Sequence, residues 1–293
     1  MGKDRLPDFF IVGSPKAATT SLYHYLTQIP EIFVPSKKSP EHYTRNYPKS
    51  FFTKPLKDKK KYLSLFNDAT EKQMVGEASV FYLIDPESPK LIKQDVPNAK
   101  IVMILRHPVQ RSFSHYLMFN SAGVEKMSFS ERIEKEKEML KDGFNSESYC
   151  LLPSFYHDSV KRYFDIFGKD NVKVFIFEEF VKDVQKTLEE LMDFFKIDCE
   201  IPELKKETYN IFSKPKGKLS QLLLRDRKIM PIAGEILPDK IRWSIKEKFL
   251  LTESKKPKLN QSDQKMLEEI FRDDSIKLQE LLGRELPWDF IKN

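Results

Sequence analysis

The chain of 293 residues has little cysteine and no long apolar run. Its two cysteines, Cys150 and Cys199, are too few and too isolated for a disulfide framework or a zinc site. No stretch has the apolar length of a signal peptide or a transmembrane helix, so we expect a cytoplasmic protein without a membrane span. Gly/Ser-rich linkers, low-complexity segments and internal repeats are also lacking, which favours one domain over residues 1–293.

The charge is only slightly unbalanced, with a formal net charge of +6 at pH 7. This excess fits an anionic cofactor, although solvated surface lysines are the commoner cause of such a balance. A nucleic-acid-binding protein would show a basic stripe with aromatic platforms or a known module, and neither appears. We therefore expect no nucleic-acid partner.

The clearest motif is a strand, a tight turn and a helix start near the N-terminus. Phe9 to Val12 form an apolar run that breaks at Gly13 and Pro15, and a helical pattern begins at Thr19. Free N–H groups and the helix dipole make such a helix start attractive to anions. The predicted anion contacts are Lys16 and the backbone of Ala17, Ala18, Thr19, Thr20 and Ser21.

This loop differs from the P-loop of nucleotide triphosphatases. That motif places a lysine and a magnesium-binding hydroxyl after its second glycine. Here Lys16 comes three residues after Gly13, and Ala-Ala-Thr-Thr follows it. The loop is P-loop-like without the magnesium-triphosphate arrangement, and a P-loop nucleotide kinase is the alternative enzyme class.

A second anion motif follows the apolar strand predicted over 100–105. Arg106 stands at the carboxyl end of this strand, where ligands collect in open α/β sheets. Pro108 suits the first turn of a new helix, which carries Ser114 on its second turn. The guanidinium of Arg106 and the hydroxyl of Ser114 can therefore converge on one phosphate.

Strands and helices alternate along the chain. Strands are predicted near 8–12, 74–76, 101–105 and 172–177, and helices near 19–28, 109–120, 128–141, 155–167, 184–195 and 262–282. This alternation predicts a single α/β domain with a central parallel sheet flanked by helices. The two anion motifs then lie at neighbouring strand ends. The helix near 128–141 is highly charged and is expected to face solvent with i,i+4 ion pairs.

The two motifs resemble those of sulfotransferases that use 3′-phosphoadenosine 5′-phosphosulfate (PAPS). Ser14 to Tyr23 look like the 5′-phosphosulfate loop, and Ile104 to Tyr116 look like the 3′-phosphate motif of the glycosaminoglycan-type and bacterial carbohydrate branch. Weaker resemblances cover Gly76 to Leu83 and Leu278 to Trp288. The resemblance implies a metal-free sulfuryl transfer from PAPS to a hydroxyl of a carbohydrate, glycolipid-like or polyketide-like acceptor. It also implies that Lys16 stabilises the leaving 5′-phosphate.

A third basic segment matches the place where family members carry a loop that closes over the nucleotide. Lys216, Gly217 and Lys218 are its candidate contacts with the 3′-phosphate or the adenosine. A plain exposed linker is the equal alternative. The glycine would let the backbone approach a phosphate closely.

The catalytic base departs from the family pattern. Related enzymes often have Lys-Glu-Pro-His-Phe-Phe after the first helix, with the glutamate as base, and an ungapped alignment puts Ser39 in that position. Serine cannot act as that base. Glu41 is the first candidate, His42 the second and Glu77 the third. A module that binds PAPS or its product 3′,5′-adenosine diphosphate (PAP) without catalysis is the non-enzyme alternative.

Overall fold

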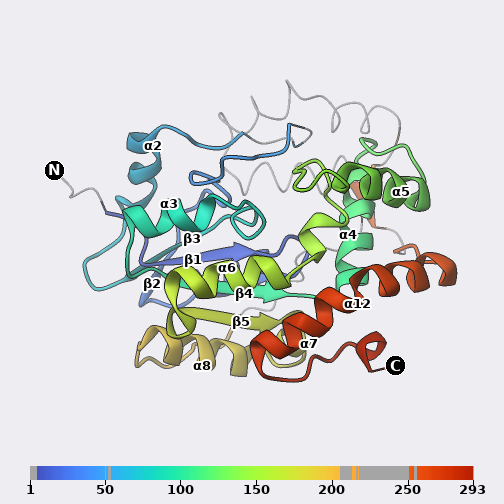
Figure 1. Ribbon diagram of the computed structural model, residues 1–293. Coiled ribbons are helices and arrows are strands. Elements are labelled where there is room, and N and C mark those ends of the chain that lie inside the picture. The colour runs from blue at the N-terminus through green and yellow to red at the C-terminus, as the bar shows by residue number, and fades with distance from the viewer. Residues whose placement is uncertain are drawn as a thin grey trace.

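The centre of the structure, a computed structural model, is a five-stranded parallel sheet (Figure 1). The described residues are 5–49, 51, 54–204, 213–215, 217, 251–253 and 256–292. In spatial order the strands are β2 (Ile32–Phe33), β3 (Met74–Ala78), β1 (Phe9–Gly13), β4 (Lys100–Leu105) and β5 (Val172–Ile176). A separate antiparallel pair consists of β6 (Ser213–Pro215) and β7 (Leu251–Glu253). The parallel sheet confirms the α/β fold predicted from the sequence.

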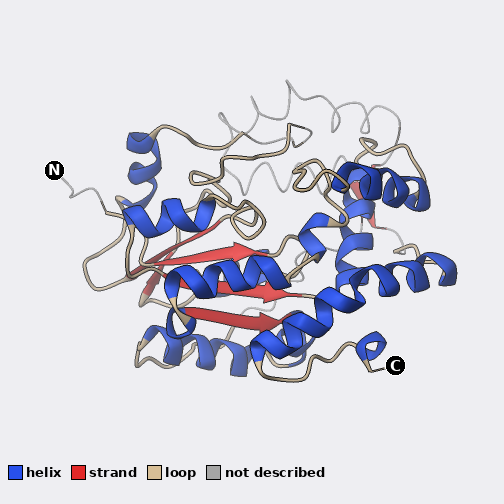
Figure 2. Cartoon of the chain, in the orientation of Figure 1, coloured by secondary structure: helices blue, strands red, loops and turns tan. Residues whose placement is uncertain are grey.

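Helices cover both faces of this sheet (Figure 2). One face carries α3 (Ser88–Asp95), α6 (His157–Phe167) and α12 (Gln261–Leu282), and the other carries α1 (Thr19–Leu26), α7 (Phe177–Lys182) and α8 (Val184–Phe195). The remaining α-helices are α2 (Lys59–Leu63), α4 (Pro108–Ser121) and α5 (Phe129–Leu140). Short 3₁₀ turns span Ser64–Phe66, Leu152–Ser154, Lys169–Asn171 and Asp289–Ile291.

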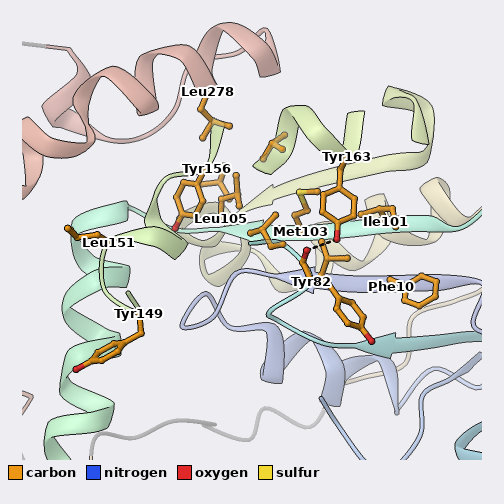
Figure 3. Packing of buried hydrophobic residues seen from close by; sticks show 14 of the residues in the cluster. Phe10, Tyr82, Ile101, Met103, Leu105, Tyr149, Leu151, Tyr156, Tyr163 and Leu278 are labelled. Carbon is orange, nitrogen blue, oxygen red and sulfur yellow. Dashed lines mark hydrogen bonds between the residues drawn. The ribbon is translucent and has the colours of Figure 1, made fainter. Parts of the chain in front are cut away.

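The two cores follow from the alternation of side chains along a buried strand. In β1, Phe10 and Val12 belong to the core under α6 and α12, whereas Phe9 and Ile11 belong to the core under α1 and α8. All four side chains are fully buried, as expected for a strand covered on both sides. Figure 3 shows the first core, in which the Tyr163 hydroxyl donates to the carbonyl of Tyr82 at 2.8 Å.

Strand β1 lies at a topological switch point. It pairs in parallel with β3 on one side and with β4 on the other. Its continuation stays close to both neighbours: the Ser14 N–H donates to the carbonyl of Ile104 at 2.8 Å. A Cβ at Gly13 would lie 2.8 Å from the Cβ of Leu83, so a glycine is needed for this close approach. Ligands of open α/β sheets bind at the carboxyl edge of such a switch point.

The predicted elements agree with the structure to within two residues at most ends. The fourth helix begins at Pro108, the position predicted for its first turn. The short β2, α2, α3 and α7 were not predicted. Each has eight residues or fewer, too short for a periodic pattern to stand out.

The expectation for the charged helix α5 is wrong for its inner face. Arg132 and Glu136 form the expected i,i+4 pair at 2.7 Å, but both side chains are buried. The Glu136 carboxylate accepts hydrogen bonds from the Ser148 hydroxyl at 2.6 Å and from the Leu151 N–H at 2.7 Å. These long-range partners, more than ten residues away, make the buried charge tolerable.

Both cysteines are free thiols. Cys150 is fully buried next to Glu136, to which its N–H donates at 3.0 Å. Cys199 lies near the end of the second long described segment and is partly exposed. Burial raises the pKa of both thiols.

No helix in the described part of the chain is long and apolar enough to cross a membrane.

Candidate functional site

The predicted anion loop joins β1 to α1 at the carboxyl edge of the sheet (Figure 1). Lys16 and Ala18 both adopt left-handed backbone conformations, with φ of 70° and 62°. The first hydrogen bond of α1 runs from the Leu22 N–H to the Ala18 carbonyl at 3.1 Å. By the geometry of a helix start, the N–H groups of Thr19, Thr20 and Ser21 lie before this bond and are available to a ligand.

Lys16 lies in a cluster of cations. Its Nζ contacts the Sδ of Met118 on α4 at 3.7 Å. Burial lowers its pKa to about 8, with further lowering by the charges of Arg106, Lys256 and Lys38. Several positive charges gathered at a strand end repel one another, and a bound anion relieves this repulsion.

Arg106 connects the second anion motif to the first. It follows β4 directly, and its Nη1 donates to the carbonyl of Lys16 at 3.0 Å. Its guanidinium stacks over the ring of Phe177, 4.3 Å from the centroid. The Nε of Arg106 has no hydrogen-bond partner among the described residues. The stacking fixes the guanidinium, and its free N–H can meet a phosphate oxygen.

Arg111 lies five residues further and is used differently. Its guanidinium is fully buried, and its Nε donates to the Ser154 hydroxyl at 2.5 Å. Its Nη2 donates to the carbonyl of Tyr149 at 3.0 Å and to that of Cys150. Arg111 therefore holds α4 to the 149–154 segment and leaves little for a ligand.

The remaining nucleotide candidates are only partly placed. Ser114 is half-buried on α4, and no hydrogen bond to Arg106 is present among the described residues. Gly217 is exposed, and no atom of the described residues lies within 4 Å of the position that a Cβ would take there. Lys216 and Lys218 lie outside the described residues.

Glu41 lies on a segment held against the end of β3. The Ser39 N–H donates to the Ala78 carbonyl at 2.9 Å, and the Glu41 N–H donates to the Ser79 hydroxyl at 2.9 Å. Both Ser39 and Glu41 have left-handed backbones, with φ of 58° and 51°. This local geometry, which disfavours ordinary residues, fixes the Glu41 side chain inward.

Glu41 is 1% exposed. Its carboxyl accepts a hydrogen bond from the Thr44 hydroxyl at 2.9 Å. Burial raises its pKa to about 8, and the nearby Glu77 adds to the increase. A carboxylate with a pKa near neutral is suited to proton transfer.

The other two base candidates are held in different surroundings. His42 stacks on Tyr62 with ring centroids 4.1 Å apart, and its Nδ1 lies 2.6 Å from the Leu56 carbonyl. Burial lowers its pKa. Glu77 is fully buried, and burial raises its pKa to about 7 against the opposing effect of the hydroxyls of Tyr62, Ser79 and Tyr82. Neither oxygen of Glu77 makes a hydrogen bond of ordinary geometry among the described residues.

Comparison with known proteins identifies the family of this chain. The sequence model of the sulfotransferase domain matches residues 6–278. The chain belongs to the sulfotransferase family. A sulfotransferase from Alicyclobacillus acidocaldarius has a similar structure, with a TM-score of 0.71 and 28% identity over 96% of this chain and 98% of that one.

Curated relatives of this sulfotransferase domain are longer proteins. Human bifunctional heparan sulfate N-deacetylase/N-sulfotransferase 3 is 26% identical over 302 residues, which cover 97% of this chain and 31% of that protein. The membrane-associated sulfotransferase kil1 of Dictyostelium discoideum is 28% identical over 141 residues, covering 46% of this chain and 29% of that protein. The chain spans less than half of the length of these relatives.

Two further basic residues, which the sequence did not single out, lie close to the predicted anion motifs. Lys38, next to the base segment, donates from Nζ to the Thr20 hydroxyl at 3.1 Å. Lys256, just before α12, interacts electrostatically with Lys16 and Arg106. The only sequence signal for Lys256 is the basic run 255–258, which by itself is typical of an exposed linker.

Proposed function

We propose that the protein transfers the sulfuryl group of PAPS to a hydroxyl of an acceptor. The observation that carries the proposal is a chain of contacts across the site. Arg106 bonds to Lys16, and Lys38 bonds to Thr20 beside the buried carboxyl of Glu41. The cations of this chain of contacts suit a donor with two anionic ends, and the carboxyl at its end suits an acceptor that must lose a proton. Membership of the sulfotransferase family supports the same reaction class.

The 5′-phosphosulfate is assigned to the loop between β1 and α1. Backbone N–H groups from Ala18 to Ser21 surround the phosphate, whereas the Ala17 N–H donates to the Ser14 carbonyl at 3.3 Å. Lys16 stabilises the negative charge that develops on the phosphate as it leaves. Preorganised donors of this kind act where charge develops in the transition state. Sulfuryl transfer resembles loose phosphoryl transfer, in which nucleophile and leaving oxygen lie in line.

The 3′-phosphate is assigned to Arg106 and Ser114, with Lys216, Gly217 and Lys218 as the closing loop. The free Nε of Arg106 supports this assignment. Lys256 joins this group because it interacts electrostatically with Arg106.

Glu41 is assigned as the general base. It removes the proton of the acceptor hydroxyl as the acceptor oxygen bonds to sulfur and the bond from sulfur to the 5′-phosphate oxygen breaks. The products are the sulfated acceptor, PAP and protonated Glu41, which then releases its proton to water. The anchored ring of His42 counts against His42 as the base. Glu41 and Glu77 are both buried, and Glu41 is favoured because it interacts with Lys38, which bonds to Thr20 of the anion loop.

The acceptor is assigned to the carbohydrate class. The curated relative named for heparan sulfate is the basis of this assignment. It is the part of the proposal that depends most on relatives, and acceptor screening addresses it separately.

Titration calorimetry in EDTA tests the cofactor. PAP should bind without metal and more tightly than ATP, because the loop has an early lysine and lacks the magnesium hydroxyl of a P-loop kinase. Tighter binding of ATP, or a need for metal, would favour the kinase alternative. Transfer of labelled sulfate from PAPS to any carbohydrate or to water then separates an enzyme from a module that only binds PAP.

A further inference from the structure

Lys38 is a cation next to the anion loop between β1 and α1. It comes from the segment that carries the base, yet its Nζ lies 3.1 Å from the hydroxyl of Thr20, in the first turn of α1. This contact joins the donor side of the site to the acceptor side. The Thr20 hydroxyl accepts this bond and keeps its own proton free for a ligand oxygen.

Lys38 interacts electrostatically with two charged groups of the site. Its charge lowers the pKa of Lys16, and it interacts favourably with Glu41. No carboxylate of the described residues lies within 4.0 Å of its Nζ, so it has no ion-pair partner there. Burial lowers the pKa of Lys38 to about 8, and the charge of Glu41 opposes this lowering. In its protonated form the side chain bonds, within the described part of the chain, only to the neutral Thr20 hydroxyl, so two of its three N–H donors remain for a ligand.

We propose that Lys38 is a second catalytic lysine, which donates to the non-bridging oxygens of the sulfuryl group during transfer. The inference rests on the proposed function. In an in-line reaction the sulfur passes between the leaving 5′-phosphate, held by Lys16, and the acceptor oxygen, held by Glu41. Lys38 is the described cation that interacts with both of these residues.

Lys16 and Lys38 contact different oxygens of the donor in this proposal. Lys16 stabilises the oxygen whose bond to sulfur breaks, so it contacts both PAPS and PAP. Lys38 contacts only oxygens that travel with the sulfur to the acceptor. It gives up no proton and forms no covalent bond. Its ammonium offsets charge on the equatorial oxygens and orients the sulfuryl group toward the acceptor.

The experiment compares the affinity for PAPS with that for PAP, which needs no acceptor. Lys38→Met keeps the length of the side chain and removes its charge. It should weaken PAPS binding about tenfold, the lower end for a charge-assisted hydrogen bond, while PAP affinity changes less than about twofold. Lys37→Met, at the exposed neighbouring lysine, is the matched control and should leave both affinities unchanged.

Turnover gives a second readout. The rate of sulfuryl transfer from PAPS, to water or to an acceptor, should fall by about 10²–10³ in Lys38→Met, and Lys38→Arg should restore part of it. Circular dichroism of each variant checks that the fold is retained.

Two results would overturn the inference. An equal loss of PAPS and PAP affinity would place Lys38 on the 5′-phosphate, and unchanged PAPS affinity with unchanged turnover would make it a structural link to Thr20. Failure of the proposed function looks different, because the unmodified protein itself would then bind neither PAP nor PAPS.

Discussion

On the donor side of the site, the functional groups stand on loops that continue buried strands. Lys16 follows β1, Arg106 follows β4, and the two are joined by one hydrogen bond. On the base side, Glu41 stands on an irregular segment with left-handed residues, far in sequence from the strand that holds it. The donor side is positioned by the sheet itself, whereas the base side is positioned by a few specific hydrogen bonds.

This comparison separates binding from chemistry. In the proposed assignment, cations at the strand ends attract and hold the anionic donor, and loss of one should weaken binding. The buried carboxyl of Glu41 contributes little to an anionic donor and should act in turnover alone. Substitutions on the two sides should therefore give different patterns of affinity and rate.

The largest expected effect is on the base side. Glu41→Gln should lower turnover by about 10²–10⁴ while PAP affinity is unchanged, because the amide cannot accept the acceptor proton. Steady-state kinetics and calorimetry on the same preparation measure both. If the variant keeps full activity on a true acceptor, Glu41 is not the base, and Glu77→Gln is the next variant to compare.

The same side predicts a pH dependence. Burial raises the pKa of Glu41 to about 8, so the fraction of deprotonated base, and with it the rate, should increase as the pH rises toward about 8. Burial lowers the pKa of Lys16 to about 8 in the ligand-free protein, so loss of its charge should lower the rate at higher pH. The pH–rate profile of the unmodified protein measures both limbs, and Glu41→Gln should lose the rising one. A profile with no rising limb would contradict the assignment of Glu41 as the base.

Lys16→Ala comes next and should affect both binding and turnover. Loss of a preorganised donor to the leaving group lowers the rate by about 10²–10³, and PAP affinity falls as well. A variant that loses rate without losing PAP affinity would contradict the assignment of Lys16 to the 5′-phosphate.

The two arginines of the second motif offer a sharper contrast. Arg106→Ala should weaken PAP binding by about 1.5–3 kcal/mol and barely change binding of adenosine 5′-phosphosulfate, which has no 3′-phosphate. Arg111→Met should instead lower the free energy of unfolding by about 2–4 kcal/mol, because it removes buried hydrogen bonds to the carbonyls of Tyr149 and Cys150 and to the Ser154 hydroxyl. Calorimetry and denaturant titration distinguish the two outcomes. Equal losses for both nucleotides in Arg106→Ala would make that arginine structural.

The smallest effect is expected at His42. Its ring is anchored by Leu56 and stacked on Tyr62, so His42→Ala should remove an aromatic contact worth about 0.5–1.5 kcal/mol of stability. Turnover should fall less than about tenfold. A loss of turnover comparable with that of Glu41→Gln would make His42 a candidate for the general base again.

Sequence patterns predicted the strand, turn and helix start of the anion loop, and the start of α4, because the determinants of these elements are local. An apolar run, a break and a helix start are visible within a dozen residues around Gly13, and Pro108 marks the first turn of α4. The order of strands and helices then predicted the parallel sheet. Only the short elements were missed, since they lack a full period.

The base side depended on contacts that no local pattern contains. The ungapped alignment puts Ser39 at the position of the base, and Glu41 reaches it only after a shift of register. In the structure, backbone bonds to Ala78 and Ser79 hold this segment, and the Glu41 side chain is buried while Ser39 is partly exposed. In the same way, Lys38 meets Thr20 eighteen residues away, and Glu136 is buried because residues 148–151 bond to it. Hydrogen bonds between residues distant in the sequence, and not local composition, determine where these side chains lie.

The different exposure of the two cysteines allows one position of the unmodified sequence to be labelled. Cys150 is shielded by the protein interior, while Cys199 is reachable at the surface, beyond α8 and away from the sheet edge that carries the site. A maleimide dye at mildly alkaline pH should therefore attach at one position without any engineered substitution. The dye would report global tumbling and unfolding by fluorescence anisotropy in the unmodified sequence.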